Sequence, residues 1–290
     1  MRNLDENSIT GVVLERHAGA TSARLAQVMD SLVTHLHAFA REVHLSEEEW
    51  FTGIRFLTEC GHITDEQRQE FILLSDTLGL SMLVTALNQR KPAGCTEATV
   101  LGPFHVPSAP RCELGDDVAR GAPGEPCFVR GQVRGGAGEV IPYAELEVWQ
   151  ADEAGLYDVQ YGPEAPARAR AVLRADERGH FHFRTIVANA YPIPHDGPVG
   201  KLLEALGRHP WRPAHLHFLI RAPGYERLIT HVFREGDRYL DSDAVFGVRS
   251  SLIARWQPHA PGEAPDGTRL SQRFYTLDFD FVLQREHRPG

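Results

Sequence analysis

The chain is poor in cysteine, and its cysteines are not spaced for a metal site or a disulfide framework. Four cysteines occur in 290 residues, and no two of them form a Cys-x-x-Cys motif, which argues against a zinc ribbon and against structural disulfides. The N-terminus lacks the basic start and apolar run of a signal peptide, and no apolar run is long enough to cross a bilayer. We therefore predict a cytoplasmic protein that does not enter a membrane.

Basic residues are also in the minority. Lysine and arginine number 30 against 39 aspartates and glutamates, which gives a formal net charge of −9. A negatively charged chain is repelled by phosphate, so neither nucleic acid nor an anionic membrane is expected as a partner. In contrast, 42% of the residues are hydrophobic, which is enough for the core of one large domain or two modest ones.

The first third of the chain has the spacing of helices. Residues 10–90 repeat apolar side chains at helical intervals, and Ser46 with Glu49 matches a capping box. A last helix is expected from Thr64 to Leu87. Most of its faces are apolar, which favours burial between other structural elements. A subunit interface is one interpretation.

The rest of the chain consists of short apolar or alternating runs separated by glycine and proline, as in an antiparallel sandwich. The expected strands are residues 127–133, 146–150, 180–187, 215–221, 228–233 and 275–283. We predict a mixed α and β fold, with a helical N-terminal domain at residues 1–96 and an antiparallel β-sandwich domain at residues 97–290.

Three His-x-His motifs occur, and chance alone would give about one. They are His35 and His37, His180 and His182, and His215 and His217. The first pair lies in a helical stretch, where residues two apart diverge, and the second alternates with phenylalanines that we expect to face the core. Only His215 and His217 have apolar residues on both faces of their strand, so both imidazoles are expected to be buried. The spacing leaves two interpretations, a metal site or two hydrogen-bonded core histidines.

Two tyrosines and one arginine stand out among the polar residues near the predicted strands. Tyr157 follows a strand end and a turn, and Tyr191 lies in a loop stiffened by prolines. Each could equally be an ordinary loop tyrosine. If both met the two histidines, their phenolate oxygens would suit Fe(III) better than Zn(II). Arg212 could stabilise an anionic intermediate in the same pocket or form a surface ion pair.

These residues lie in segments that resemble the intradiol ring-cleaving dioxygenases. The matching segments are Thr99–Phe104, Glu147–Asp152, Gly155–Gln160, Tyr191–Gly200 and Arg212–His217. The resemblance implies one non-haem Fe(III) per subunit, held by Tyr157, Tyr191, His215 and His217. It further implies that Tyr191 accepts a proton from the substrate and that Arg212 stabilises negative charge on the ring.

Within this family the chain is most similar to the hydroxyquinol 1,2-dioxygenases, which cleave benzene-1,2,4-triol with O2. The resemblance implies a substrate pocket lined by Leu73, Asp76, Val100, Leu101, Gly102, Phe104, Ile193, Pro194, Arg212 and Val245. A carboxylate at Asp76 could accept a hydrogen bond from the third hydroxyl, and such a site should reject plain catechol. The alternative is that Asp76 is an exposed helix residue. No basic residue near Asp76 is evident in the sequence.

The resemblance also implies a homodimer formed through the N-terminal helices, with lipid bound in an apolar tunnel there. Catechol or chlorocatechol is the alternative substrate for the same chemistry. Two alternatives of other classes are a zinc hydrolase, which would use His215 and His217 with a carboxylate, and a non-catalytic sandwich that binds aromatic ligands.

Overall fold

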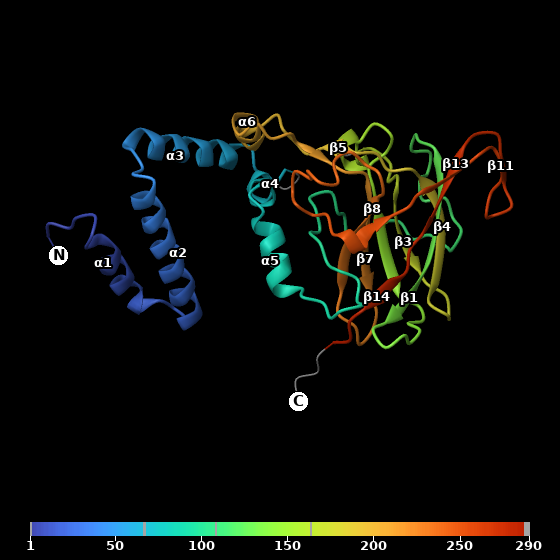
Figure 1. The fold of residues 1–290 in the computed structure, drawn as a ribbon, viewed down its shortest axis with the longest axis horizontal. Coiled ribbons are helices and arrows are strands. Elements are labelled where there is room, and N and C mark those ends of the chain that lie inside the picture. The colour runs from blue at the N-terminus through green and yellow to red at the C-terminus, as the bar shows by residue number, and fades with distance from the viewer. Residues whose placement is uncertain (1, 66–67, 108, 163, 287–290) are drawn as a thin grey trace. The chain divides into compact units, whose positions relative to one another are not determined.

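The computed structural model describes residues 2–65, 68–107, 109–162 and 164–286. The chain forms two compact units, residues 1–62 and residues 63–290. The first unit is helical, and the second begins with two further helices, which the sheets follow (Figure 1). The predicted domain boundary between residues 96 and 97 stays a prediction.

Two of the helices in the first third of the chain begin where a side chain caps them. Ser22 accepts a hydrogen bond from the Leu25 backbone N–H at 3.1 Å. The capping box is confirmed, because the Glu49 side chain accepts from the Ser46 N–H at 2.9 Å while the Ser46 hydroxyl accepts from the Glu49 N–H at 3.2 Å. The helices are α1 (Ile9–Arg16), α2 (Ala23–Glu42), α3 (Glu47–His62), α4 (Glu70–Thr77) and α5 (Leu80–Asn88).

The prediction of one continuous last helix was wrong. The chain instead forms α4 and α5, which are bent by 77° relative to each other. Gly79 separates them in the left-handed region, with a φ of 75°, and this conformation ends a helix at little steric cost only for glycine. The predicted start at Thr64 is followed by residues 66 and 67, which lie outside the described residues, and α4 begins at Glu70.

In the described part of the chain no single helix is long and apolar enough to cross a membrane. Taken together, α4 and α5 satisfy the same length and composition criteria, but only as a pair with a sharp bend between them.

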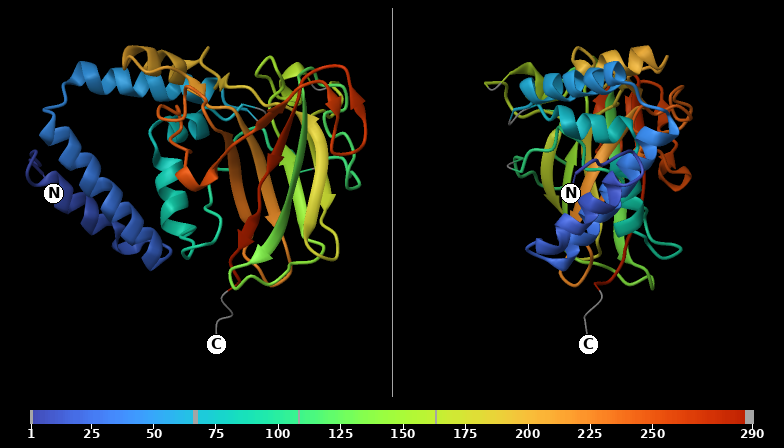
Figure 2. Two further views of the ribbon diagram at one scale, coloured as in Figure 1. Left: turned by 45° about the vertical axis from the view of Figure 1, so that its right-hand side comes forward. Right: turned by 90° about the vertical axis from the view of Figure 1, so that its left-hand side faces the viewer.

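Two five-stranded sheets make up the β-domain and face each other (Figure 2). The first has the order β10-β13-β1-β14, with β4 also paired to β1, and the second has the order β3-β2-β7-β8-β9. Their inner faces share one core, in which Phe218 contacts Phe181 and Phe281 across the gap. The strands are β1 (Pro126–Gly135), β2 (Glu145–Trp149), β3 (Arg170–Arg174), β4 (His180–Ile186), β7 (His215–Arg221), β8 (Leu228–Arg234), β9 (Ile253–Ala254), β10 (Gln257–His259), β13 (Phe274–Asp278) and β14 (Phe281–Leu283).

The helices followed by a β-sheet domain confirm the predicted fold class, but the sheets are not purely antiparallel. Strand β1 runs parallel to β13 and β14, and β8 runs parallel to β9. Each parallel pair joins strands separated by a long connection, whereas only short hairpins require antiparallel pairing. The predicted strand 275–283 is interrupted between β13 and β14, where the Phe279 carbonyl oxygen would lie 1.8 Å from a Cβ at Gly131. Glycine is therefore required at position 131.

Six further short elements belong to the β-domain, and β5 and β6 among them carry part of the functional site. Strand β5 pairs with β6, and β11 pairs with β12. A helix, α6, and a 3-10 turn, η2, lie in the loops between the larger strands. The bounds are η2 (Asp158–Tyr161), β5 (Tyr191–Pro192), α6 (Pro198–Ala205), β6 (Trp211–Arg212), β11 (Gly262–Glu263) and β12 (Arg269–Leu270).

Strand β7 divides its side chains between two environments, as predicted. Leu216, Phe218 and Ile220 lie in the core between the sheets. His215 and His217 project from the opposite face and are nevertheless buried. The same alternation on β4 leaves His180 and His182 exposed and its phenylalanines buried, again as predicted. The β7 histidines therefore sit on a buried face outside the main core.

We expect the sandwich core to dominate the stability of the β-domain. Leu146 on β2 is fully buried, so Leu146→Ala should lower the free energy of unfolding by about 2–5 kcal/mol, because it removes buried methyl groups and leaves a cavity. Leu206, which is 58% exposed, provides the matched control, and Leu206→Ala should change stability by less than about 0.5 kcal/mol. Urea unfolding followed by circular dichroism measures both. An equal loss in the two variants would contradict this assignment of the core.

Candidate metal centre

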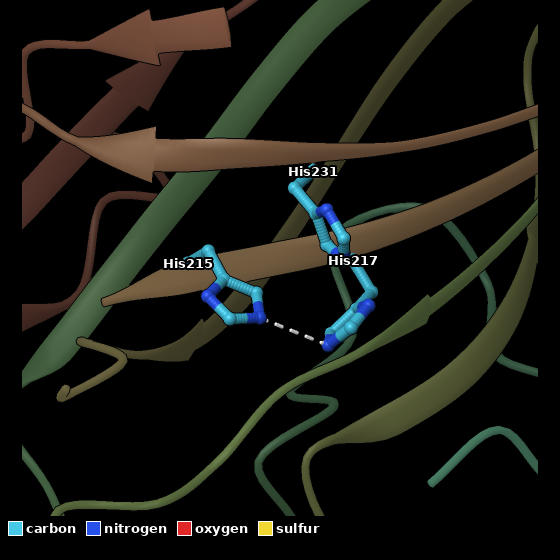
Figure 3. Close-up of side chains that lie close together, drawn as sticks. All are labelled: His215, His217 and His231. Carbon is cyan, nitrogen blue, oxygen red and sulfur yellow. Dashed lines mark hydrogen bonds between the residues drawn. The ribbon is translucent and has the colours of Figure 1, made fainter. Parts of the chain in front are cut away.

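The two histidines of β7 meet at their Nε2 atoms. These nitrogens lie 3.1 Å apart, as the dashed line in Figure 3 shows. His215 Nδ1 lies 2.7 Å from the Pro213 carbonyl oxygen. Because a carbonyl only accepts hydrogen bonds, Nδ1 carries the proton and Nε2 presents a lone pair. The backbone before β7 thus sets the tautomer that a metal ligand needs.

Tyr157 brings its phenol oxygen to the same place. Its Oη lies 2.8 Å from His217 Nε2. The tyrosine is held just before η2, where its backbone N–H donates to the Gln160 side chain at 2.9 Å. The next residue, Asp158, forms a buried ion pair with Arg170 on β3. A surface loop would leave a tyrosine free to rotate, but these contacts aim Tyr157 inward.

Tyr191 approaches from the short ladder of β5 and β6, which pairs it with Arg212. Its ring centroid lies 5.2 Å from that of Tyr157 and 5.6 Å from that of His215. Its hydroxyl lies 3.4 Å from Arg212 Nη1. The structure therefore brings all four predicted metal ligands together, although they come from three separate parts of the chain.

Arg212 is buried, so the interpretation of it as a surface residue was wrong. Its Nε lies 3.0 Å from the Asp243 carboxylate, and both side chains are only 2% exposed. Burial alone would lower the pKa of Arg212, but Asp243 and then Tyr191 more than offset this, and the pKa is raised. Burial raises and Arg212 lowers the pKa of Asp243, with a net decrease. The pair places a permanent cation 3.4 Å from His215 Nε2.

Without a metal, the surroundings of His215, His217 and Tyr157 hold all three side chains in their neutral forms. Burial, followed by the nearby Arg212 charge, lowers the pKa of His215 to about 3. Burial and the neighbouring histidines lower the pKa of His217 well below its usual value. Burial and the Tyr191 hydroxyl raise the pKa of Tyr157 well above its usual value. A metal cation would reverse the effect on Tyr157, because a nearby positive charge favours phenolate.

The spacing of the donor atoms fits a metal ion. Two donors at right angles on an ion with bonds of about 2.0–2.2 Å lie roughly 2.8–3.1 Å apart. The observed separations are 3.1 Å for the two histidine nitrogens and 2.8 Å for His217 Nε2 and Tyr157 Oη. Because His215 Nε2 is unprotonated, either His217 Nε2 donates its proton to it or both nitrogens present lone pairs that a metal ion can bind. The residues present therefore fit a mononuclear centre.

Sequence reasoning missed His231. It lies opposite His217 in the β7–β8 pairing and is fully buried, and Figure 3 shows it on the neighbouring strand. Ligand atoms of His215, His217 and His231 lie within 4.8 Å of one another, as in a possible metal site. The signal was available, because a hairpin centred near Pro223-Gly224 pairs residue 217 with residue 231. His231 Nδ1 lies 2.7 Å from the Thr99 hydroxyl.

A cavity of about 570 Å³ adjoins this cluster. Four of the residues predicted to contact substrate line it, and they are Asp76, Val100, Leu101 and Gly102. Gly102 links the cavity to the cluster, because a Cβ at this position would lie 3.3 Å from His217 Cε1. The other six predicted residues lie outside the lining of this cavity as far as the chain is described, and they are Leu73, Phe104, Ile193, Pro194, Arg212 and Val245. Phe104 instead stacks on Tyr157 with ring centroids 4.4 Å apart.

Asp76 is the polar residue that distinguishes the cavity. It is only 5% exposed, so its interpretation as an exposed helix residue was wrong. Burial raises its pKa, while the Ser81 hydroxyl and the Arg212 charge partly offset that increase. A basic residue does therefore act on Asp76, although it lies 136 positions away in the sequence, which is why sequence reasoning found none.

Comparison with known protein families agrees with this arrangement. A family model described as "Dioxygenase" matches residues 101–285, and one described as "Catechol dioxygenase N terminus" matches residues 22–96. The chain therefore belongs to the intradiol dioxygenase family, which implies a non-haem iron enzyme. The prediction of an intradiol dioxygenase is confirmed, and the zinc hydrolase and the non-catalytic sandwich are excluded by this membership.

Individual relatives match over nearly the whole chain. A 6-chlorohydroxyquinol 1,2-dioxygenase from Cupriavidus pinatubonensis is 60% identical and covers 98% of this chain and 99% of its own length. A hydroxyquinol 1,2-dioxygenase from Nocardioides simplex is 50% identical and covers 96% of this chain and 95% of its own. The solved structure of a hydroxyquinol 1,2-dioxygenase from Pseudomonas putida DLL-E4 superposes with a TM-score of 0.90 at 44% identity, covering 97% and 99%.

We expect the Arg212–Asp243 ion pair to be needed for the stability of the fold. Asp243→Ala should lower the free energy of unfolding by about 3–5 kcal/mol, because it leaves a buried guanidinium without its partner. Because the pKa of Asp243 is lowered, its carboxylate remains ionised at pH 4, and the difference from wild type should persist from pH 7 to pH 4. Urea midpoints at both pH values measure this. Asp241→Ala, at an exposed position two residues earlier, should leave the midpoint unchanged, and a similar loss there would contradict the argument.

Proposed function

We propose that this protein cleaves the ring of hydroxyquinol between its two adjacent hydroxyl-bearing carbons. One O2 is consumed, and both of its oxygen atoms enter the product, 3-hydroxy-cis,cis-muconate, which tautomerises to maleylacetate. The observation that carries the proposal is the buried Asp76 carboxylate in a cavity that reaches His217 through Gly102. Several relatives at 44–60% identity, named for hydroxyquinol or its 6-chloro derivative, support the same substrate.

We infer that one Fe(III) per chain would be held by Tyr157, Tyr191, His215 and His217. Two phenolates and two neutral imidazoles make a hard, anionic donor set that suits a trivalent ion. When bound, ferric iron would supply a Lewis acid for the two adjacent substrate oxygens and a redox partner that makes an organic cofactor unnecessary. His231 is a weaker candidate than either tyrosine, because a neutral imidazole in place of a phenolate would remove one negative charge from the donor set.

The residues around the ligand cluster have separate tasks in this proposal. Tyr191 would accept a proton from a substrate hydroxyl at its Oη, and Arg212 lies 3.4 Å from that oxygen. Arg212 stays charged because its ion pair with Asp243 offsets the free energy lost when the guanidinium is buried. Its guanidinium would then stabilise negative charge that develops on the substrate ring. The burial of all these groups excludes water and so strengthens each electrostatic interaction.

Asp76 would select the third hydroxyl of the substrate. A buried carboxylate accepts a hydrogen bond from that hydroxyl, whereas catechol would leave Asp76 desolvated with the Ser81 hydroxyl but no substrate hydroxyl to pair with. Sites built for a hydroxyl discriminate strongly against analogues that lack it. Catechol and chlorocatechol therefore rank below hydroxyquinol. A chlorinated hydroxyquinol is the second candidate, because the cavity is also lined by apolar side chains such as Leu80 and Val84.

We also infer that the N-terminal helices bury their apolar side chains against a second copy of the chain, with lipid as a further occupant. The support is exposure, since α2 exposes a row of apolar residues at helical spacing and α3 and α5 do the same. The row on α2 comprises Leu25, Val28, Leu32, Leu36 and Phe39. A cytoplasmic location stays a prediction.

The ligand set predicts a coloured protein. After loading with ferric iron, the wild type should be red, because tyrosinate transfers charge to the metal. Tyr157→Phe should shift or remove the visible band and lower turnover by at least about 100-fold, because one anionic donor is lost. The measurement is the absorption spectrum at equal iron content, determined by metal analysis.

Tyr161→Phe provides the control for this experiment. Tyr161 lies four residues beyond Tyr157, is exposed and donates to Asp152 at 2.6 Å. Its variant should keep the wild-type spectrum and activity. A colourless wild type at full iron occupancy, or an unchanged band in Tyr157→Phe, would remove Tyr157 from the proposed ligand set.

Oxygen uptake with two substrates tests the proposed function. The wild type should consume one O2 per hydroxyquinol and turn over catechol much more slowly. Asp76→Ala should lower kcat/KM for hydroxyquinol by about 10- to 100-fold, because a hydrogen bond to a charged group contributes about 1.5–3 kcal/mol. Its activity with catechol should not fall.

The matched control is Asp266→Ala, at an exposed aspartate, which should keep the wild-type preference. A wild type that prefers catechol, or an Asp76→Ala variant with an unchanged ratio of the two kcat/KM values, would contradict the proposed substrate.

A further inference from the structure

The segment of residues 100–106 lies against both kinds of proposed metal ligand. Gly102 adopts a φ of 77°, and a Cβ there would lie 3.3 Å from His217 Cε1. Two residues later, the Phe104 ring stacks on the Tyr157 ring with centroids 4.4 Å apart and an interplanar angle of 22°. A displacement of this segment would therefore disturb the packing of a histidine and a tyrosine of the centre together.

Backbone hydrogen bonds do not tie this segment to a strand. The flanking contacts are Thr99 N–H to the Ile229 carbonyl at 2.9 Å and Val172 N–H to the Pro110 carbonyl at 2.8 Å. Between these two points, among the residues that the structure describes, no backbone hydrogen bond joins residues 100–107 to either sheet. The segment must be held by its side chains.

His105 supplies a side-chain anchor. Its Nε2 lies 2.6 Å from a carboxylate oxygen of Glu147 on β2. The other carboxylate oxygen of Glu147 accepts from Arg221 on the neighbouring strand β7. Glu147 is only 5% exposed, whereas the Arg221 side chain is half-exposed. His105 is therefore bound to a carboxylate on the sheet, and Arg221 orients that carboxylate.

The anchor also contacts the centre through an aromatic stack. The His105 ring packs edge-on against Trp149, with centroids 4.9 Å apart. Trp149 in turn stacks on His217 with centroids 4.6 Å apart and an interplanar angle of 14°. Because Glu147 and Trp149 are two residues apart on β2, one strand fixes both the anchor and the ring that supports His217.

We propose that His105 and Glu147 are positioning residues that hold residues 100–106 over the metal centre and the substrate cavity. His105 Nε2–H donates to the Glu147 carboxylate, and this bond keeps Phe104 on Tyr157 and Gly102 against His217. This role deepens the proposed function, and its expected effect on kinetics rests on that function. Its structural consequence, the ordering of residues 100–106, does not depend on any activity.

Limited proteolysis of the full chain by proteinase K, with the cut sites located by mass spectrometry, tests the structural consequence. Cleavage within residues 100–107 should become at least about tenfold faster in Glu147→Ala and in His105→Phe, which keeps a ring against Trp149 but has no donor, because a released segment fits a protease more readily. The double variant should be cleaved no faster than either single variant, because each breaks the same bond. Glu147→Gln keeps an acceptor oxygen and should restore most of the resistance.

Glu145→Ala is the matched control. Glu145 lies on the same strand and also approaches Arg221, at 3.7 Å, but it does not contact His105 in the described structure. Cleavage within residues 100–107 should stay at the wild-type rate in this variant. Unchanged cleavage in His105→Phe, additive effects in the double variant, or an equal effect of Glu145→Ala would each overturn the proposal.

Kinetics of the iron-loaded enzyme test the second consequence. In His105→Phe and Glu147→Ala, KM for hydroxyquinol should rise about tenfold with a much smaller change in kcat, because the segment must be ordered when substrate binds. Faster cleavage without a change in KM would overturn the positioning role. A wild type without hydroxyquinol turnover would instead contradict the proposed function, and the cleavage result would still stand by itself.

Discussion

The close approach of buried donor atoms is the constraint on which the rest of the structure depends. Two imidazole nitrogens lie 3.1 Å apart, and a phenol oxygen lies 2.8 Å from one of them. Buried polar groups are costly unless they are paired, and in the protein alone the two imidazole nitrogens pair with each other only by sharing one proton. A metal cation bound at this place would use the lone pairs of all three donor atoms. The surrounding fold serves to keep His215, His217 and Tyr157 in that arrangement.

Two buried ion pairs help to hold the aromatic and imidazole rings in this arrangement. Asp158 with Arg170 holds the turn that carries Tyr157, and Asp243 with Arg212 holds a cation beside Tyr191. Such pairs add little net stability, but the loss of one partner is strongly destabilising. They therefore specify one geometry of the centre. The proposed His105 anchor extends the same principle to the segment over the cavity.

Much of the fold and the centre could be predicted from local pattern. The alternation around His215 and His217 predicted one buried face of histidines, and the capping box at Ser46 predicted the start of α3. Other features were missed because they depend on distant residues. The β13–β14 break requires the Phe279 carbonyl to meet Gly131, and the proximity of Arg212 to Asp76 joins residues 136 positions apart.

The sequence by itself determined which reactive side chains are present and where they lie in local structure. These are two histidines on one strand face, two tyrosines in constrained turns and an aspartate on an apolar helix. Side-chain type and local periodicity depend only on neighbouring residues, so the sequence specifies them directly. Only the tertiary structure decided that these groups converge, that His231 joins them across a strand pair, and that Asp76 lines a cavity. Convergence depends on strand pairing and sheet packing between distant segments, and no local pattern encodes the distance between two atoms that such packing brings together.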